Sequence, residues 1–151
     1  THLRYNLLQS LLYYGKASRV EAENRHYVEQ IIDFMELEEY RHHHVGTLAY
    51  GVQKRVEVAR ALTLEPQLLL LDEPMAGMNV EEKEDMSRFI LDVNEQLGTT
   101  IVLIEHDMDA VFQLADRISV LVSGKIIARG TADEIRNHPE VRTAYLGEDA
   151  A

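Results

Sequence analysis

The spacing of apolar residues predicts helices in the first third of the chain. Leucines recur at helical intervals over residues 3–12, and Gly15 can end that segment. A second helix is predicted from about residue 20 to residue 35, with Ile31 and Met35 on its apolar face. A polar connector comes next, so this part of the chain has the pattern of a helical region.

Strand and helix patterns alternate after the connector. Gly51 is predicted to open a helix, and the wholly apolar run at residues 68–71 is typical of a strand buried on both faces of a parallel sheet. Asn79 and Glu82 have the spacing of a capping box, which predicts a helix that begins there and stops at Gly98. The chain thus passes from strand to helix, as α/β proteins do.

The same alternation continues to the end of the chain. The further predicted elements are a second buried strand at residues 100–104, a short helix at 107–115, strands at 118–122 and 125–128, and a closing helix that begins in the capping-box pattern of 131–134. Ser123 and Gly124 lie between the last two strands and are typical of a tight hairpin turn. Together these elements indicate an α/β fold with a C-terminal hairpin.

Composition excludes several classes of partner and site. The formal net charge is −11, and an acidic surface repels phosphate backbones, so no nucleic-acid partner is expected. The chain has no cysteine, which excludes disulfides and thiolate metal sites. No apolar run approaches the length needed to cross a bilayer, so any role at a membrane is expected to depend on a partner.

Two carboxylates stand at the end of the first predicted strand. Successive strand residues point in opposite directions, so Asp72 and Glu73 are expected to have different roles. In P-loop nucleoside triphosphatases an aspartate at this place holds Mg²⁺ through its hydration shell. A neighbouring glutamate can polarise the attacking water. Taken by itself, the run fits equally well a buried strand followed by a solvated acidic turn.

The sequence before this strand gives the run a context. Residues 48–62 resemble the signature motif of ATP-binding cassette (ABC) proteins and the helix behind it, and residues 68–74 resemble their Walker B strand. His106, at the end of the next strand, resembles the switch histidine that contacts the γ-phosphate. The segment 75–79 resembles the D-loop, which crosses the dimer interface in that family, and Asn79 belongs to it.

The resemblance implies roles for the signature-like segment, residues 48–52. A glycine at a helix start exposes amides at the positive end of the helix dipole, where phosphate binds. In the family this site serves the ATP held by a second subunit, so function requires a head-to-tail dimer. The residues implied in nucleotide binding are Leu48, Ala49, Tyr50, Gly51 and Val52, together with Asn79.

The resemblance also implies the fold and the activity. The expected fold is α/β and P-loop NTPase-like, with part of the ABC helical subdomain at residues 1–50 and the C-terminal part of the ATPase core at 51–151. The tail at 130–147 is similar to the end of the ATP-binding subunits of branched-chain amino acid importers. The implied function is hydrolysis of ATP with Mg²⁺, which would power a membrane permease from the cytoplasmic face. The alternative is an ABC-type module in a protein with no transport role or in a fusion protein.

The sequence departs from the family pattern at several positions. It contains no GxxxxGK[ST] loop, since Gly15 and Lys16 lack the upstream glycine and the preceding strand. Family order places that loop and the glutamine switch before Thr1, so the chain alone is expected to be catalytically incomplete. Ala49 and Tyr50 replace the usual serine and glycine, and loss of one neutral hydrogen bond costs on the order of 1 kcal/mol.

Two further features bear on the site. Asn79 stands where the D-loop usually has aspartate, so a charge is lost while the helix cap is kept. Three consecutive histidines, His42, His43 and His44, suggest a metal site. Adjacent residues in a flexible connector rarely converge on one ion, so a polar surface turn is the favoured interpretation.

Overall fold

A computed structural model describes residues 7–146 of the chain, with side chains described from residue 20 to residue 145. The chain forms two compact units, Thr1–Gln67 and Leu68–Ala151. The helix that begins at Tyr50 therefore lies in the first unit. The subdomain division expected at residue 50 remains a prediction.

The first unit is helical, as predicted. Its elements are α1 (Leu7–Phe34), the short 3-10 turns η1 (Glu38–Tyr40) and η2 (Val45–Thr47), and α2 (Tyr50–Leu62). The expected break at Gly15 is wrong, because α1 is continuous from Leu7 to Phe34. One glycine costs a helix interior about 1 kcal/mol relative to alanine, which does not outweigh helical sequence on both sides. Residues 3–6 of the predicted segment lie outside the described residues.

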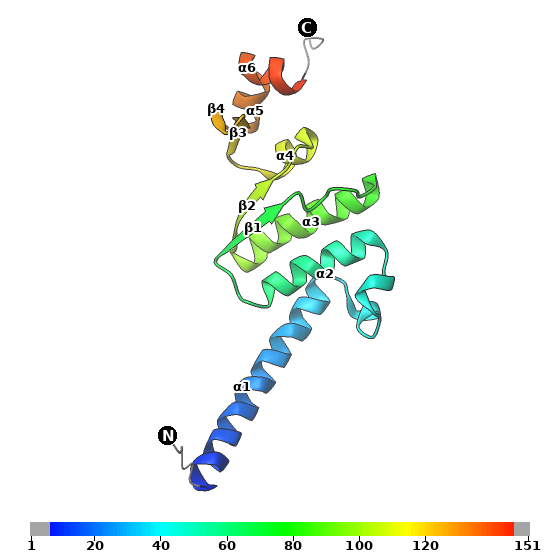
Figure 1. Ribbon diagram of the computed structural model, residues 1–151, viewed down its shortest axis with the longest axis vertical. Helices are drawn as coiled ribbons and strands as arrows, with labels where there is room; N and C mark the ends of the chain where they lie inside the picture. The colour runs from blue at the N-terminus through cyan, green and yellow to red at the C-terminus, as the bar shows by residue number, and fades with distance from the viewer. Residues whose placement is uncertain (1–6, 147–151) are drawn as a thin grey trace. The chain divides into compact units, whose positions relative to one another are not determined.

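Helix α2 packs against the C-terminal end of α1 (Figure 1). Ile31, Met35 and Leu62 are buried there. The Tyr27 hydroxyl donates to the carbonyl of Leu62 at 3.3 Å, and the Arg55 guanidinium donates to the carbonyl of Met35 at 3.4 Å. These contacts join segments up to 35 residues apart in sequence, and they hold α2 in position against α1.

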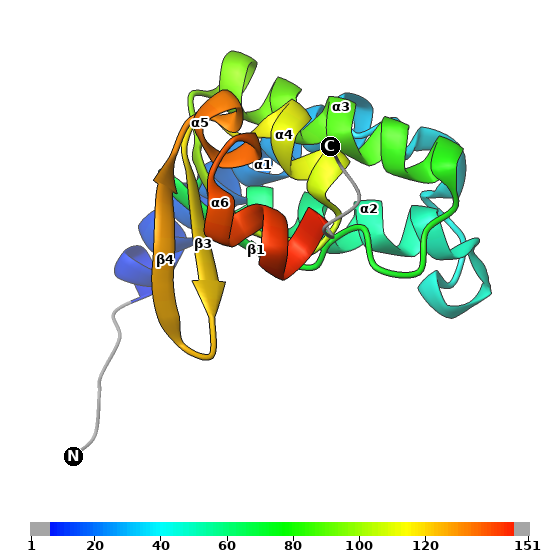
Figure 2. The ribbon, with the colours of Figure 1, turned by 90° about the horizontal axis from the view of Figure 1, so that it is seen from above.

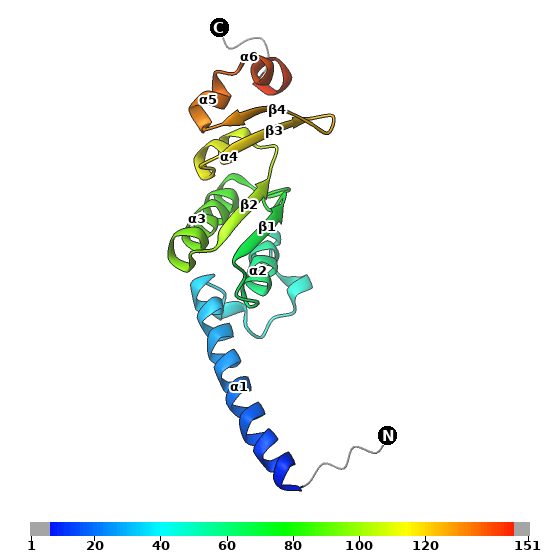
Figure 3. The same cartoon turned by 90° about the vertical axis from the view of Figure 1, so that its left-hand side faces the viewer.

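The second unit contains a parallel pair of strands, β1 (Leu68–Asp72) and β2 (Thr100–Ile104), connected through α3 (Val80–Leu97) (Figure 3). Both predicted strands are confirmed. Leu68 lies opposite Thr100, and Asp72 lies opposite Ile104. Because the strands are parallel and in this register, the residues that follow them leave from the same edge of the sheet.

Burial of these strands differs from the prediction. In β1, Leu69 is buried, but Leu68 and Leu70 are 52% and 68% exposed. In β2, Val102 and Ile104 are exposed as well. A strand is buried on both faces only when a layer covers each face. Within the described part of this unit, α3 packs on one face, and the leucine and valine side chains of the other face remain exposed.

Helix α3 has the predicted ends. The Asn79 side chain accepts from the amide of Glu82 at 2.9 Å, and the Glu82 carboxylate accepts from the amide of Asn79 at 3.0 Å. Gly98 ends the helix with a left-handed φ of 67°, a conformation that glycine adopts without a steric cost. The buried face of the helix carries Met86, Phe89, Ile90 and Val93.

The C-terminal part consists of α4 (Met108–Leu114), the antiparallel hairpin of β3 (Ile118–Val122) and β4 (Lys125–Gly130), and the short helices α5 (Ala132–Arg136), α6 (Pro139–Val141) and η3 (Arg142–Leu146). Ser123 and Gly124 both have positive φ, as a two-residue type I′ hairpin turn requires, and this prediction is confirmed. Helices α5 and α6 lie beside the hairpin (Figure 2). Ile135 and Val141 from these helices join the core formed by the strands.

No helix within residues 7–146 combines the length and the apolar character needed to span a membrane.

Candidate functional site

The two strand-end carboxylates lie where β1 gives way to a turn. Asp72 is the last residue of β1, and its side chain is exposed. Glu73 has a φ of 45°, and its amide donates to the carbonyl of Ile104 on β2 at 2.9 Å. A left-handed conformation costs a residue other than glycine roughly 1–2 kcal/mol, and such residues cluster at functional sites. Because of this backbone conformation, the Glu73 side chain does not take the direction that it would have in a continued strand.

Glu73 and His106 approach one another across the edge of the sheet. The imidazole Nδ1 of His106 lies 3.6 Å from Oε1 of Glu73, and the two side chains are 69% and 52% exposed. The contact depends on the register of the parallel pair, because His106 comes two residues after the end of β2 and Glu73 one residue after the end of β1. In contact with solvent, the carboxylate can orient a water molecule, and the imidazole can donate a hydrogen bond to an oxyanion.

Glu105 also belongs to this edge, and no role is expected for it from the sequence pattern. Its Oε1 accepts from the backbone amide of Met75 at 3.1 Å, and its Oε2 accepts from the amide of His106 at 3.3 Å. Glu105 therefore links the segment after β2 to the turn after β1. Glu105 directly precedes the switch-like His106, but the Met75 amide that it binds lies 30 positions away in the sequence. No local sequence pattern identifies a contact of that range.

A second contact that the sequence did not predict joins α3 to α4. The ammonium of Lys83 lies 2.6 Å from Oδ2 of Asp107. Asp107 is also the N-cap of α4 and accepts from the amide of Ala110. Lys83, and after it the Ala110 amide, hold the pKa of Asp107 below its usual range, while the bond to Asp107 raises the pKa of Lys83. The pair fixes α4, and hence the loop that carries His106, to the start of α3.

The lowered pKa gives stability a defined dependence on pH. Asp107 stabilises the fold above its ordinary pKa, and this stabilisation disappears as the pH falls through the lowered pKa. Replacing Asp107 with asparagine keeps a good N-cap but removes the charge. We therefore expect Asp107→Asn to lower the urea midpoint at about pH 7, and the difference from wild type to shrink progressively toward acid pH.

Urea unfolding at a series of pH values measures this effect. Asp116→Asn is the matched control, because it removes an exposed aspartate for which the structure of residues 7–146 gives no ion pair. A constant difference between Asp107→Asn and wild type across the acid range would show that the Lys83 pair contributes nothing.

The signature-like segment lies in the first unit. Ala49 is the N-cap of α2, is exposed and makes no side-chain capping bond, while Tyr50 is 46% exposed. Gly51 and Val52 are buried in the first turn of α2, and Leu48 is half-buried. The side-chain amide of Gln53 donates to the carbonyl of Leu48 at 2.8 Å, which closes the turn that precedes the helix. The segment is therefore a well-ordered helix start with its small residues at the tip.

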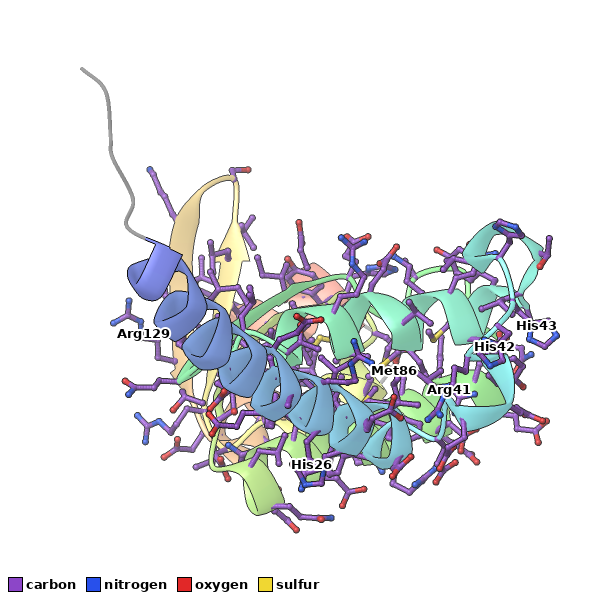
Figure 4. The ribbon with its side chains drawn as sticks, turned by 90° about the horizontal axis from the view of Figure 1, so that it is seen from below. His26, Arg41, His42, His43, Met86 and Arg129 are labelled. Carbon is purple, nitrogen blue, oxygen red and sulfur yellow. The ribbon has the colours of Figure 1, made fainter. Side chains whose placement is uncertain are left out.

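Asp72, the candidate magnesium ligand, is not part of a cluster of ligating side chains within residues 7–146. Asp72 is exposed at the end of β1, and in residues 7–146 no cluster of three or more ligating side chains could hold an ion. A single carboxylate suits Mg²⁺, which keeps most of its waters and takes one or two protein ligands together with phosphate oxygens. His42 and His43 project from the loop that joins α1 to α2, and both side chains are exposed (Figure 4).

Comparison with known proteins gives these features a family context. A family model described as ABC transporter matches residues 2–76, and a model described as branched-chain amino acid ATP-binding cassette transporter matches residues 125–151. The high-affinity branched-chain amino acid transport ATP-binding protein BraF of Pseudomonas aeruginosa is 40% identical over 147 residues, which are 97% of this chain and 58% of BraF. LivG of Escherichia coli strain K12, described in the same words, is 38% identical over 97% of this chain and 57% of LivG.

Solved structures agree in fold. MJ1267 in its ADP conformation, an ATP-binding cassette of an ABC transporter, superposes with a TM-score of 0.75 at 31% identity over 83% of this chain and 51% of that one. CbiO1 of Clostridium perfringens, part of the ABC transporter complex cbiONQ, gives a TM-score of 0.73 at 30% identity over 82% of this chain and 49% of its own. The chain spans a little over half the length of the curated relatives that it matches.

Proposed function

Because the chain belongs to the family of ATP-binding subunits of ABC transporters, we propose that the protein binds and hydrolyses ATP to power a membrane permease. The observation that carries this proposal is the approach of Glu73 to His106, at 3.6 Å, with Asp72 directly before Glu73 at the end of β1. These three side chains leave from one edge of the parallel pair. The proposal thus rests on a constellation in space as well as on family membership.

The chain supplies two of the groups that hydrolysis of a phosphoanhydride uses. Glu73 is the proposed base, since its exposed carboxylate can accept a hydrogen bond from the attacking water and orient it. His106 is proposed to donate a hydrogen bond to a γ-phosphate oxygen, which neutral imidazole can do. The separation of the two side chains leaves them close enough to act on the same phosphoryl group.

Asp72 is the proposed residue that holds magnesium. A bound Mg²⁺ would supply charge neutralisation on the β- and γ-phosphate oxygens. In residues 7–146 no hydrogen bond or ion pair engages the Asp72 carboxylate, so it is available to the hydration shell of an ion. A single carboxylate of this kind suits an ion that keeps most of its waters.

The signature-like segment is proposed to act on nucleotide held by a second copy of the subunit. Helix α2 has 13 residues, and its first turn presents backbone amides at the positive end of the helix dipole. Ala49 places no bulky or polar side chain at the cap, which leaves room for a phosphate group. The proposed assembly is therefore a head-to-tail dimer in which residues 48–52 of one subunit face the ATP of the other.

The cargo and the place of action follow from the relatives. BraF and LivG are described as branched-chain amino acid transport proteins, and the C-terminal family model carries the same description. We therefore infer that the cognate permease imports branched-chain amino acids and holds this subunit at the cytoplasmic face of the membrane.

Uptake of radiolabelled leucine, isoleucine and valine tests the function in the source cells. Deletion of the gene is expected to abolish high-affinity uptake of these amino acids and to leave uptake of arginine unchanged. Wild-type gene restores uptake, and a Glu73→Gln gene does not. Unchanged leucine uptake after deletion, in cells without a second such system, would contradict the proposed cargo, and wild-type uptake with Glu73→Gln would contradict the proposed mechanism.

A further inference from the structure

The turn that follows β1 is held by two kinds of contact. Within the turn, the amide of Ala76 donates to the carbonyl of Glu73 at 3.1 Å, and the amide of Met78 donates to the carbonyl of Met75 at 3.2 Å. From outside the turn, the Glu105 carboxylate accepts from the amide of Met75 at 3.1 Å. The local bonds give the turn its shape, and the bond to Glu105 ties it to the segment after β2.

The amide that Glu105 accepts from has a strong need for a partner. Met75 is only 1% exposed, and a buried amide without an acceptor costs the fold the desolvation of that group. A carboxylate is also a stronger acceptor than a neutral group. Since the other oxygen of Glu105 accepts from the amide of His106, one side chain holds two backbone amides at once.

Those two amides flank the pair proposed to act on phosphate. Met75 comes two residues after Glu73, and the second amide belongs to His106 itself. The Glu73 amide is bonded to the carbonyl of Ile104, directly before Glu105. A movement of Glu105 therefore displaces the backbone on both sides of the Glu73–His106 contact.

We propose that Glu105 is a positioning residue that couples the switch histidine to the D-loop-like segment, residues 75–79, through its bond to the Met75 amide. It sets the distance between Glu73 and His106 and passes a displacement of His106 to the segment expected to cross the dimer interface. This inference rests on the proposed function for its catalytic consequence, while the coupling of the two segments stands on the geometry alone.

Two conservative variants of Glu105 separate the effect of side-chain length from the effect of negative charge. Glu105→Asp keeps the carboxylate but withdraws it by about 1.5 Å, the length of one carbon–carbon bond, so it loses the Met75 amide. Glu105→Gln keeps the reach and one acceptor oxygen, which can still accept from the Met75 amide, but it loses the charge and the second oxygen that accepts from the His106 amide. If the hydrogen bond positions the site, the aspartate variant is the impaired one, even though it is chemically closer in charge.

The experiment measures ATP turnover and amide exchange in the protein as its gene encodes it. We expect Glu105→Asp to lower kcat about tenfold with KM for ATP changed less than about twofold, and Glu105→Gln to stay within about threefold of wild type. Hydrogen exchange of the Met75 amide is expected to accelerate in Glu105→Asp and to change little in Glu105→Gln. Glu95→Ala, which removes an exposed glutamate from α3, is the control and leaves both measurements unchanged.

The outcomes separate this inference from the proposed function. Wild-type turnover in Glu105→Asp, or equal losses in both variants, would overturn the positioning role. If the wild-type protein hydrolyses no ATP, the proposed function fails, but the exchange of the Met75 amide still decides the coupling. Unchanged exchange in Glu105→Asp would overturn it, and faster exchange would support it.

Discussion

Replacing Glu73 with glutamine is expected to lower kcat for ATP hydrolysis at least about a hundredfold, the lower limit of what a positioned general base contributes. Glutamine has nearly the same shape as glutamate, but its amide cannot take a proton from water or polarise it through a negative charge. Because Glu73 is 52% exposed and follows the last residue of β1, the change creates no cavity in the core. The fold and the affinity for ATP are therefore expected to be retained.

Steady-state turnover and equilibrium binding of ATP, measured on the same preparation, test this prediction. Glu84→Gln is the matched control, because it makes the same chemical change at an exposed position of α3. Loss of turnover together with loss of ATP binding would assign Glu73 to binding instead of to the chemical step. Turnover equal to wild type would remove Glu73 from the mechanism.

Replacing Phe89 with alanine is expected to destabilise the protein by about 3–5 kcal/mol, the range for removing a large aromatic side chain from a core. Phe89 is 1% exposed on the inner face of α3, and the Arg88 guanidinium lies 4.4 Å from its ring centroid. The free energy of folding of most domains is about 5–15 kcal/mol, so the loss is a large fraction of it. Helix α3 carries Asn79 and Lys83 at its start, and the variant is expected to lose ATP turnover through unfolding.

Urea denaturation followed by circular dichroism measures the change. Val80→Ala on the same helix is the control, since Val80 is 74% exposed and its truncation is expected to alter the free energy of unfolding by less than about 0.5 kcal/mol. A loss below about 1 kcal/mol for Phe89→Ala would mean that α3 does not hold the core of the second unit.

The parts of the fold that sequence predicted well are those fixed by neighbouring residues. The ends of α3 follow from Asn79, Glu82 and Gly98. The first two accept hydrogen bonds from backbone amides at the start of the helix, and Gly98 adopts the left-handed conformation that ends it. The hairpin turn likewise depends on two adjacent residues that adopt positive φ. Such interactions are independent of the rest of the chain, and their patterns can be read directly.

The predictions that failed depended on what surrounds an element. Gly15 has the properties of a helix stop, but the sequence on either side continues the helix and determines the outcome. The apolar composition of β1 predicts burial on two faces, yet Leu70 is exposed because burial requires a second layer. Neither property is encoded in the segment itself.

The candidate site divides in the same way. Asp72, Glu73 and His106 are proposed from their positions at strand ends and from family resemblance, and the register of β1 and β2 accounts for the approach of Glu73 to His106. The bonds of Glu105 to the Met75 amide and of Lys83 to Asp107 span 30 and 24 residues. Contacts of that range arise from packing, so only the structure could identify them.

The measurement that tests the central claim most directly is a structure of the Glu73→Gln protein, as its gene encodes it, with ATP and Mg²⁺. Slow turnover in this variant is expected to preserve the ATP-bound dimer. Our account predicts that the γ-phosphate lies beside residue 73 and His106, that Asp72 faces the hydrated Mg²⁺, and that residues 48–52 of the partner subunit cover the phosphate. Nucleotide bound away from the edge where β1 and β2 end would contradict the account.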